Sequence, residues 1–113
     1  MNKEYTREFK VRWSELNAHG DAHLAAYLRF LVETAWKWGE SHQLGAAESQ
    51  ALGLAWVFRE TQIEILKPLQ AGDHFEFRIW FMNWRRVRGT RGFEIRLIDG
   101  GEIAARGIQQ VVT

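Results

Sequence analysis

The chain has 113 residues, of which 46% are hydrophobic and 13% aromatic, and its formal net charge is +1. This composition is typical of one compact globular domain over residues 1–113 and argues against a disordered protein. The sequence contains no cysteine, which excludes a thiol nucleophile, disulfides and thiolate metal ligands. No segment has the apolar core of a signal peptide or the ~20 apolar residues of a membrane span, so we expect a cytoplasmic protein.

A strand, a polar loop and a long helix are expected first along the chain. Residues 4–12 place Tyr5, Phe9 and Val11 among charged neighbours, an alternation that predicts a strand. Residues 22–42 carry apolar side chains at helical spacing and predict a helix about 30 Å long. The apolar positions of this helix are Leu24, Tyr27, Leu28, Leu31, Ala35 and Trp38.

The second half of the chain has the period of β-strands. A short helical turn over residues 46–52 precedes strands over residues 54–66, 74–84, 89–99 and 102–112, with breaks at Pro68 and at Asp99-Gly100-Gly101. This order predicts an α+β fold in which a five-stranded antiparallel sheet wraps around one long central helix. The sheet face opposite the helix should carry Trp56, Phe58, Trp80, Met82 and Trp84.

Aromatic residues are numerous for a chain of this length, with six Trp and seven Phe. A small domain buries only about two thirds of the surface of its unfolded chain, so some of these side chains remain outside unless another chain covers them. We therefore expect self-association, as a homodimer or a homotetramer.

The polar loop before the helix is the candidate site. Asn17, His19, Asp21 and His23 fall at every second position, and the helix begins directly behind them. The first turn of a helix presents unpaired N–H groups and a partial positive charge, which favour an anion or a developing oxyanion. Asp21 could also simply cap the helix, and the two roles are compatible.

Three stretches of the sequence resemble one family. RWSELNAHGDAHLAAYL, residues 12–28, is similar without a gap to the RWSDLDxNxHVNNxxYI stretch of plant-type acyl-ACP thioesterases. LAWVFRETQIEILKPLQAGDHFEF, with its Gly72-Asp73 turn, and GEIAARGIQQVVT, from Gly101, resemble later strands of that family. The chain thus resembles the hotdog-fold thioesterase superfamily, including its acyl-CoA, acyl-ACP and 4-hydroxybenzoyl-CoA thioesterase branches.

The resemblance implies a hotdog fold and a thioester hydrolase that releases a carboxylic acid and a free thiol from an acyl-CoA or an acyl carrier protein. It implies no cofactor other than the coenzyme A or phosphopantetheine of the substrate. The family's catalytic aspartate position is Asn17 here, its asparagine position is His19 and its histidine position is Asp21. Its paired asparagines are His23 and Leu24, whereas Tyr27 and Glu33 match its pattern. The missing aspartate motivates the alternative of a non-catalytic hotdog protein that binds acyl groups or serves as a scaffold.

We assign catalytic roles to three residues of this loop, Asn17, His19 and Asp21, and to Glu33 of the helix. His19 would activate water, since an imidazole has a suitable pKa near neutrality, with Asp21 or Glu33 orienting it. Asn17 would hold the water or the thioester oxygen. The alternatives are a solvated loop histidine, a turn-forming asparagine, and for Glu33 a rung of the charged ladder between Arg29 and Lys37 on the helix.

Substrate contacts are assigned to residues around the loop and to a basic run further on. The first group is His23, Leu24, Tyr27 and Trp56, and the second is Arg85, Arg86 and Arg88 within the run from Arg78 to Arg91. The basic run would dock the phosphates of coenzyme A or the acidic surface of a carrier protein. A solvated strand connection is the plainer interpretation, and the near-neutral chain argues against nucleic acid.

Two other chemistries are less well supported by the sequence. His19-x-Asp21-x-His23 has the ligand types and alternate spacing of a metal site, but the family implies none and we predict no metal. A serine hydrolase is not supported either, because the sequence has no G-x-S-x-G motif.

Overall fold

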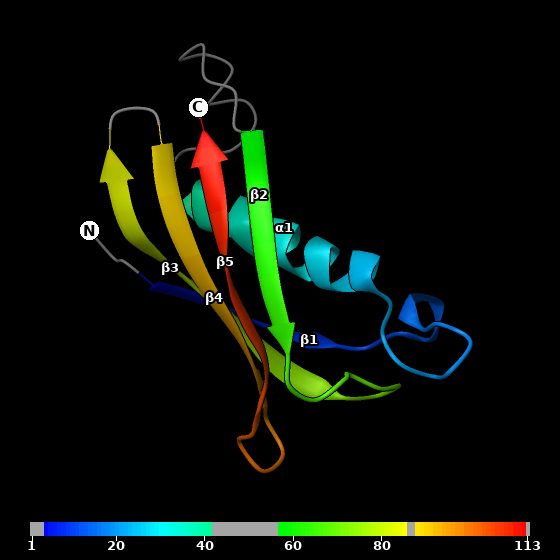
Figure 1. Cartoon of the computed structure of the whole chain (residues 1–113). Helices are drawn as coiled ribbons and strands as arrows, with labels where there is room; N and C mark the ends of the chain where they lie inside the picture. The colour runs from blue at the N-terminus through cyan, green and yellow to red at the C-terminus, as the bar shows by residue number, and fades with distance from the viewer. Residues whose placement is uncertain (1–3, 42–56, 86–87, 113) are drawn as a thin grey trace.

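The computed structural model describes residues 4–41, 57–85 and 88–112, and it contains one helix packed on one sheet (Figure 1). The elements are β1 (Glu4–Lys10), the 3-10 helix η1 (Trp13–Glu15), α1 (Leu24–Ser41), β2 (Val57–Ile65), β3 (His74–Arg85), β4 (Arg88–Leu97) and β5 (Ile103–Val112). This order confirms the predicted α+β fold. The predicted helical turn over residues 46–52 and Trp56 lie outside the described residues.

The five strands form one antiparallel sheet in the order β1-β3-β4-β5-β2. The three strands in the middle of the sheet, β3, β4 and β5, are also consecutive along the chain. The earlier strands β1 and β2 add to the two sides of this group. The free edges of the sheet are therefore β1 and β2.

The core lies between α1 and one face of the sheet, and it follows from the alternation of the strands. Phe75, Phe77 and Ile79 of β3 pair in register with Leu97, Ile95 and Phe93 of β4, and all six are buried. They meet the buried helix residues Tyr27, Phe30, Leu31, Ala35 and Trp38. Because α1 packs mainly against β1 and β3, the core is thickest on that side of the sheet.

The outer face of the sheet carries charged side chains that pair across strands. Arg78 Nη1 lies 3.0 Å from Glu4 Oε1, and Arg78 Nη2 lies 3.5 Å from Glu94 Oε1. Trp80 is on this face as predicted, with the Arg78 guanidinium stacked 4.7 Å from its ring centroid. These pairs indicate an outer face built for water rather than for a core.

The prediction was wrong for Phe58, which lies on the face that α1 covers. Its ring is 5.2 Å from the guanidinium of Arg91, which also lies 5.8 Å from the ring of Phe81 on β3. The register of β2 with β5 shifts between Phe58 and Glu60, and such a bulge moves every side chain before it to the other face. Met82 is 57% exposed, and the side chain of Trp84 is not among those described.

An apolar strip of α1 remains exposed in the single chain. Leu24, Leu28, Val32 and Trp36 recur at four-residue spacing and are 37–56% exposed, so they form one line along the helix. Phe58, Ile65 and Leu66, in and just after β2, are also 40–49% exposed. Within the described part of the chain, no helix combines the length and apolar character that a membrane span requires.

Candidate active site

The polar loop between η1 and α1 is a closed turn organised by Asn17. The Oδ1 atom of Asn17 accepts hydrogen bonds from the backbone N–H of His19 at 2.8 Å and of Asp21 at 3.2 Å. The backbone N–H of Asn17 donates to Asp21 O at 2.7 Å, and Gly20 has φ +83°, a conformation that glycine adopts without strain. The asparagine therefore forms the turn, as one of the two interpretations predicted, and its amide NH₂ group is left as a donor.

The start of α1 is capped by His23 and not by Asp21. The backbone N–H of Ala26 donates to His23 Nδ1 at 3.0 Å and to His23 O at 2.9 Å, so His23 holds the first turn of the helix. Asp21 and Ala22 instead form single β-bridges, with Gln70 and Leu16 respectively. These bridges explain why α1 begins at Leu24, two residues later than expected.

Two backbone donors remain at this helix terminus. Helix geometry gives the N–H groups of Leu24 and Ala25 no partner within α1, and no residue in the described ranges accepts from them. Both residues are exposed. The first turn of α1 can therefore offer two N–H donors, together with the partial positive charge of the helix, to a carbonyl oxygen that gains negative charge.

His19 is exposed at the tip of the loop. None of the described carboxylates lies within hydrogen-bonding distance of its ring, so the orienting partner predicted for it is not supplied by the part of this chain that the structure shows. The Asp21 carboxylate instead accepts from the Gln70 side chain, with Nε2 to Oδ1 at 3.4 Å. Asn17, His19, Asp21 and His23 therefore share one loop, but the structure shows no hydrogen-bond network that joins the side chains of these four described residues.

Tyr27 connects the first turn of α1 to the segment after β2. Its hydroxyl oxygen accepts from the backbone N–H of Leu69 at 2.9 Å, and its side chain is buried. Burial, and the negative charges of Asp21 and Asp73 in smaller measure, raise the pKa of the Tyr27 hydroxyl above 10.0, while the bond from Leu69 opposes the rise. Tyr27 is therefore a neutral, buried anchor behind the loop, whereas the neighbouring Leu24 is 56% exposed.

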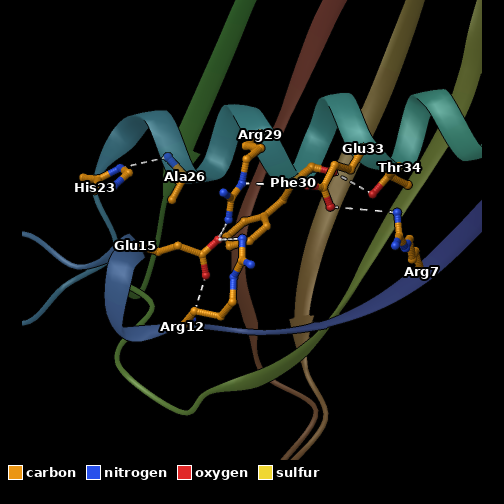
Figure 2. A network of polar contacts seen from close by, with 9 residues as sticks. All are labelled: Arg7, Arg12, Glu15, His23, Ala26, Arg29, Phe30, Glu33 and Thr34. Carbon is orange, nitrogen blue, oxygen red and sulfur yellow. Dashed lines mark hydrogen bonds and ion pairs between the residues drawn. The ribbon is translucent and has the colours of Figure 1, made fainter.

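The buried carboxylate of Glu15 fixes the loop to the helix, and sequence analysis missed it (Figure 2). Glu15 is 2% exposed; its Oε1 atom accepts from the backbone N–H of Arg12 at 2.7 Å, and its Oε2 atom pairs with the guanidinium groups of Arg12 and Arg29. Its backbone oxygen accepts from His23 N at 2.9 Å. An acid three residues after the start of a turn is a capping pattern, and that spacing was the signal available in the sequence.

Glu33 lies away from the loop, on the exposed side of α1. It is ten residues beyond His23, about 15 Å along a helix, and its carboxylate lies 3.8 Å from Arg29 Nε and 3.9 Å from Arg7 Nη1. Figure 2 shows it between these two arginines. In a single chain Glu33 is a surface ion-pair residue that does not reach His19.

Two of the three arginines assigned to substrate docking, Arg85 and Arg88, lie at the far end of the sheet. Arg85 is the last residue of β3, whose twelve residues span about 36 Å, and His74 at the other end adjoins the turn beside the loop. Arg88 begins β4 and is exposed; Arg86 and the side chain of Arg85 are not among the described parts. One chain therefore does not place Arg88 beside His19.

The described residues contain no group of three or more His, Asp or Glu side chains arranged to hold a metal ion. In the predicted triplet His19-x-Asp21-x-His23, the Nδ1 atom of His23 already accepts a backbone N–H. Prediction of a metal-free site rests on the family resemblance.

One helix wrapped by a five-stranded antiparallel sheet, with a polar loop leading into the helix, defines a hotdog-fold protein of the thioesterase superfamily. A family model of the acyl-ACP thioesterase N-terminal domain matches residues 2–111. The chain belongs to this family, and the resemblance read from residues 12–28 is confirmed.

Solved structures agree on the fold at low sequence identity. A 1,4-dihydroxy-2-naphthoyl-CoA thioesterase from Synechocystis is 19% identical, with a TM-score of 0.87 over 96% of this chain and 80% of that one. The Staphylococcus aureus protein SAV2348, solved in complex with CoA, is 19% identical, with a TM-score of 0.89 over 99% and 71% of the two chains. A putative oleoyl thioesterase from Lactobacillus plantarum has a TM-score of 0.91 at 19% identity, and this chain spans 42% of its length. No curated protein sequence matches the chain significantly.

Replacing the Glu15 carboxylate by an amide should loosen the loop. In Glu15→Gln the new NH₂ group faces guanidinium donors, so a buried carboxylate bond is lost and we expect unfolding to become easier by about 1–3 kcal/mol. Glu33→Gln is the matched control, because it also removes a carboxylate held by two arginines, but a half-exposed one worth at most about 1 kcal/mol. Thermal or urea unfolding of the two variants measures the difference; equal losses would contradict the assigned role of Glu15.

Proposed function

We propose that this protein hydrolyses an acyl thioester of coenzyme A or of acyl carrier protein, releasing a carboxylic acid and a free thiol. Membership of the acyl-ACP thioesterase family supports the reaction class. The observation that carries the proposal is that the loop leading directly into α1 exposes the imidazole of His19, while two N–H donors at the start of that helix have no described partner.

In the proposed mechanism, His19 takes a proton from a water molecule while the water oxygen attacks the thioester carbon. The carbonyl oxygen becomes an oxyanion, which the N–H groups of Leu24 and Ala25 stabilise. The C–S bond then breaks, and the sulfur leaves as a thiol after taking the proton held by the imidazole. The amide NH₂ group of Asn17 is available to hold the water or the thioester oxygen, since its Oδ1 atom is occupied by the turn.

The complete site is proposed to need a second copy of the chain. The exposed strip of Leu24, Leu28, Val32 and Trp36 is apolar and runs along one side of α1, so two such helices could pack side by side in a homodimer. A dimer would also let the strands and arginines of one subunit approach the loop of the other. The substrate phosphates or the carrier protein would then meet Arg85, Arg86 and Arg88; of these, Arg88 is kept away from His19 within one chain. Pairing of such dimers would give the alternative homotetramer.

A non-catalytic acyl-binding or scaffold protein is the second candidate. It is favoured by Asn17, which stands where the family places its catalytic aspartate, and by the lack of a described carboxylate at His19. Release of free thiol from a panel of acyl-CoA and acyl-ACP substrates separates the two functions. No release above background on any member would favour the binder over the hydrolase.

Removing the imidazole tests the proposed base. His19→Ala should lower kcat by about 10²- to 10⁴-fold, the usual contribution of a positioned general base, while the unfolding temperature stays near that of the parent because the side chain is exposed. Ser14→Ala, an exposed position just before the loop, is the control and should keep its turnover. The rates are measured by thiol release; an active His19→Ala enzyme would remove the base from this loop.

Asn17→Asp distinguishes two roles for the amide. The carboxylate preserves the two turn bonds made by Oδ1 and is electrostatically favoured near a helix N-terminus, so folding should persist. If Asn17 only positions water, turnover is kept or rises. We expect instead a collapse of turnover, because the free NH₂ group is the donor that faces substrate and a carboxylate would repel the oxyanion.

Placing a charge in the apolar strip tests the dimer. Val32 lies in the middle of the strip, so Val32→Glu would bury a carboxylate between the helices and should dissociate the dimer. Lys37→Glu puts the same side chain on the charged side of α1, where Lys37 pairs with Glu40, and should leave the assembly intact. Sedimentation at micromolar concentration should give twice the 13.2 kDa chain mass for the parent; a parent that sediments as one chain would overturn the assembly.

A further inference from the structure

A row of three polar side chains crosses the helix-facing side of the sheet. Arg91 of β4 pairs in register with Gln109 of β5, which pairs with Thr61 of β2. Arg91 and Gln109 are only 3% and 2% exposed, whereas Thr61 is half-buried. The next row of this face holds Phe93 and Ile63, so the polar row is set into an apolar surface.

The hydrogen bonds of the row all run in one direction. Arg91 Nη2 donates to Gln109 Oε1, and Gln109 Nε2 donates to Thr61 Oγ1 at 2.9 Å. A guanidinium can only donate, so the orientation of the Gln109 amide is fixed by Arg91. The Thr61 hydroxyl therefore receives one bond and has its own proton left to give.

The positive charge of Arg91 has no anion beside it among the described residues. Its Nε atom is buried without a hydrogen-bond partner, and its guanidinium lies 5.2 Å from the ring centroid of Phe58 and 5.8 Å from that of Phe81. Burial lowers the pKa of Arg91 to about 10, so the group is still protonated at neutral pH. The cation–π contacts and the bond to Gln109 offset part of the cost of burying this charge, but a buried cation is normally paired with an anion.

The row reaches the surface where an acyl group could meet it. Ile65 and Ile63 share a face with Thr61 on β2, and Thr61 lies about 13 Å from Ile65 at 3.3 Å per residue. Beyond Ile65 the chain reaches Leu69, which bonds to Ala22 and Tyr27 beside the candidate active site. A substrate that extends from the loop along β2 would pass two isoleucines and then arrive at a hydroxyl donor.

We propose that Thr61, backed by Gln109 and Arg91, binds a carboxylate at the distal end of the acyl group, so that the preferred substrates are thioesters of dicarboxylic acids. Thr61 contacts the carboxylate, while Gln109 and Arg91 position and polarise the Thr61 hydroxyl and supply the opposite charge. This inference rests on the proposed thioester hydrolysis and names its substrate class.

Binding of non-hydrolysable CoA thioethers tests the inference without catalysis. Pairs of equal chain length are compared by calorimetry, one ending in a methyl group and the other in a carboxylate. We expect the carboxylate to bind about 10- to 100-fold more tightly, the range of a hydrogen bond to a charged group. Thr61→Val, which removes the hydroxyl and keeps the shape, should reduce this ratio to about one.

Gln109→Glu is the sharper variant, because it places a carboxylate beside the Arg91 guanidinium and neutralises its positive charge. Its carboxylate can pair with Arg91 but can no longer donate to Thr61, so the preference for the carboxylate ligand should be lost while the unfolding temperature is kept. Gln110→Glu makes the same chemical change one residue later, on an exposed position of the other face, and should preserve the preference.

Two results would overturn the inference. Equal binding of the two thioethers to the parent would refute the carboxylate site. If thiol release from a methyl-terminated acyl-CoA is observed as well, the proposed hydrolysis still stands. An unchanged preference in both Thr61→Val and Gln109→Glu would remove these residues from the site. The absence of thiol release from every thioester would instead count against the proposed hydrolysis.

Discussion

The Glu15 carboxylate is the contact on which the candidate site depends. It joins the turn after β1 to α1 through Arg12 and Arg29, and the Glu15 backbone oxygen holds His23 at the other end of the loop. Both ends of the loop are therefore tied to one residue that water does not reach. With its ends fixed, the loop can expose Asn17 and His19 without a core of its own, which is the usual way in which a rigid scaffold supports functional side chains.

The second constraint is that one helix is too narrow for five strands. α1 packs on β1 and β3, so the strand at the opposite edge, β2, keeps Phe58 and Ile65 partly exposed, and α1 keeps its own apolar strip. The same geometry that leaves these surfaces uncovered also separates the loop from Arg88 by the length of the sheet. A partner subunit would cover these apolar surfaces and could also bring its own arginines to the loop, so the proposed assembly and the proposed activity depend on the same interface.

The sequence was sufficient for the elements but not for the contacts between them. Alternation in residues 74–84 and 89–99 specifies strands because every second side chain must be apolar, and the helix follows from its own spacing. The cap was misjudged because Asp21 and His23 are both capable acceptors, and only the bridge to Gln70 decides between them. The predicted sheet face of Phe58 was wrong because a β-bulge shifts the register of β2. The burial of Glu15 depends on Arg29, which is fourteen residues away. Neither feature is a local property of the sequence.

The arginines of the basic run have very different surroundings in the fold, although they lie close together in the sequence. Arg78 lies on the outer face between Glu4 and Glu94, Arg88 is exposed at the start of β4, and Arg91 is buried on the face toward α1. Arg91 takes a position that alternates in step with Phe93 and Ile95, where a side chain must point inward. A chain that only required positive surface charge would have no reason to place an arginine at an inward position, since the desolvation of a guanidinium opposes folding. The inward position of Arg91, more than its charge, therefore separates it from the exposed arginines of the run, and the proposed carboxylate site depends on that position.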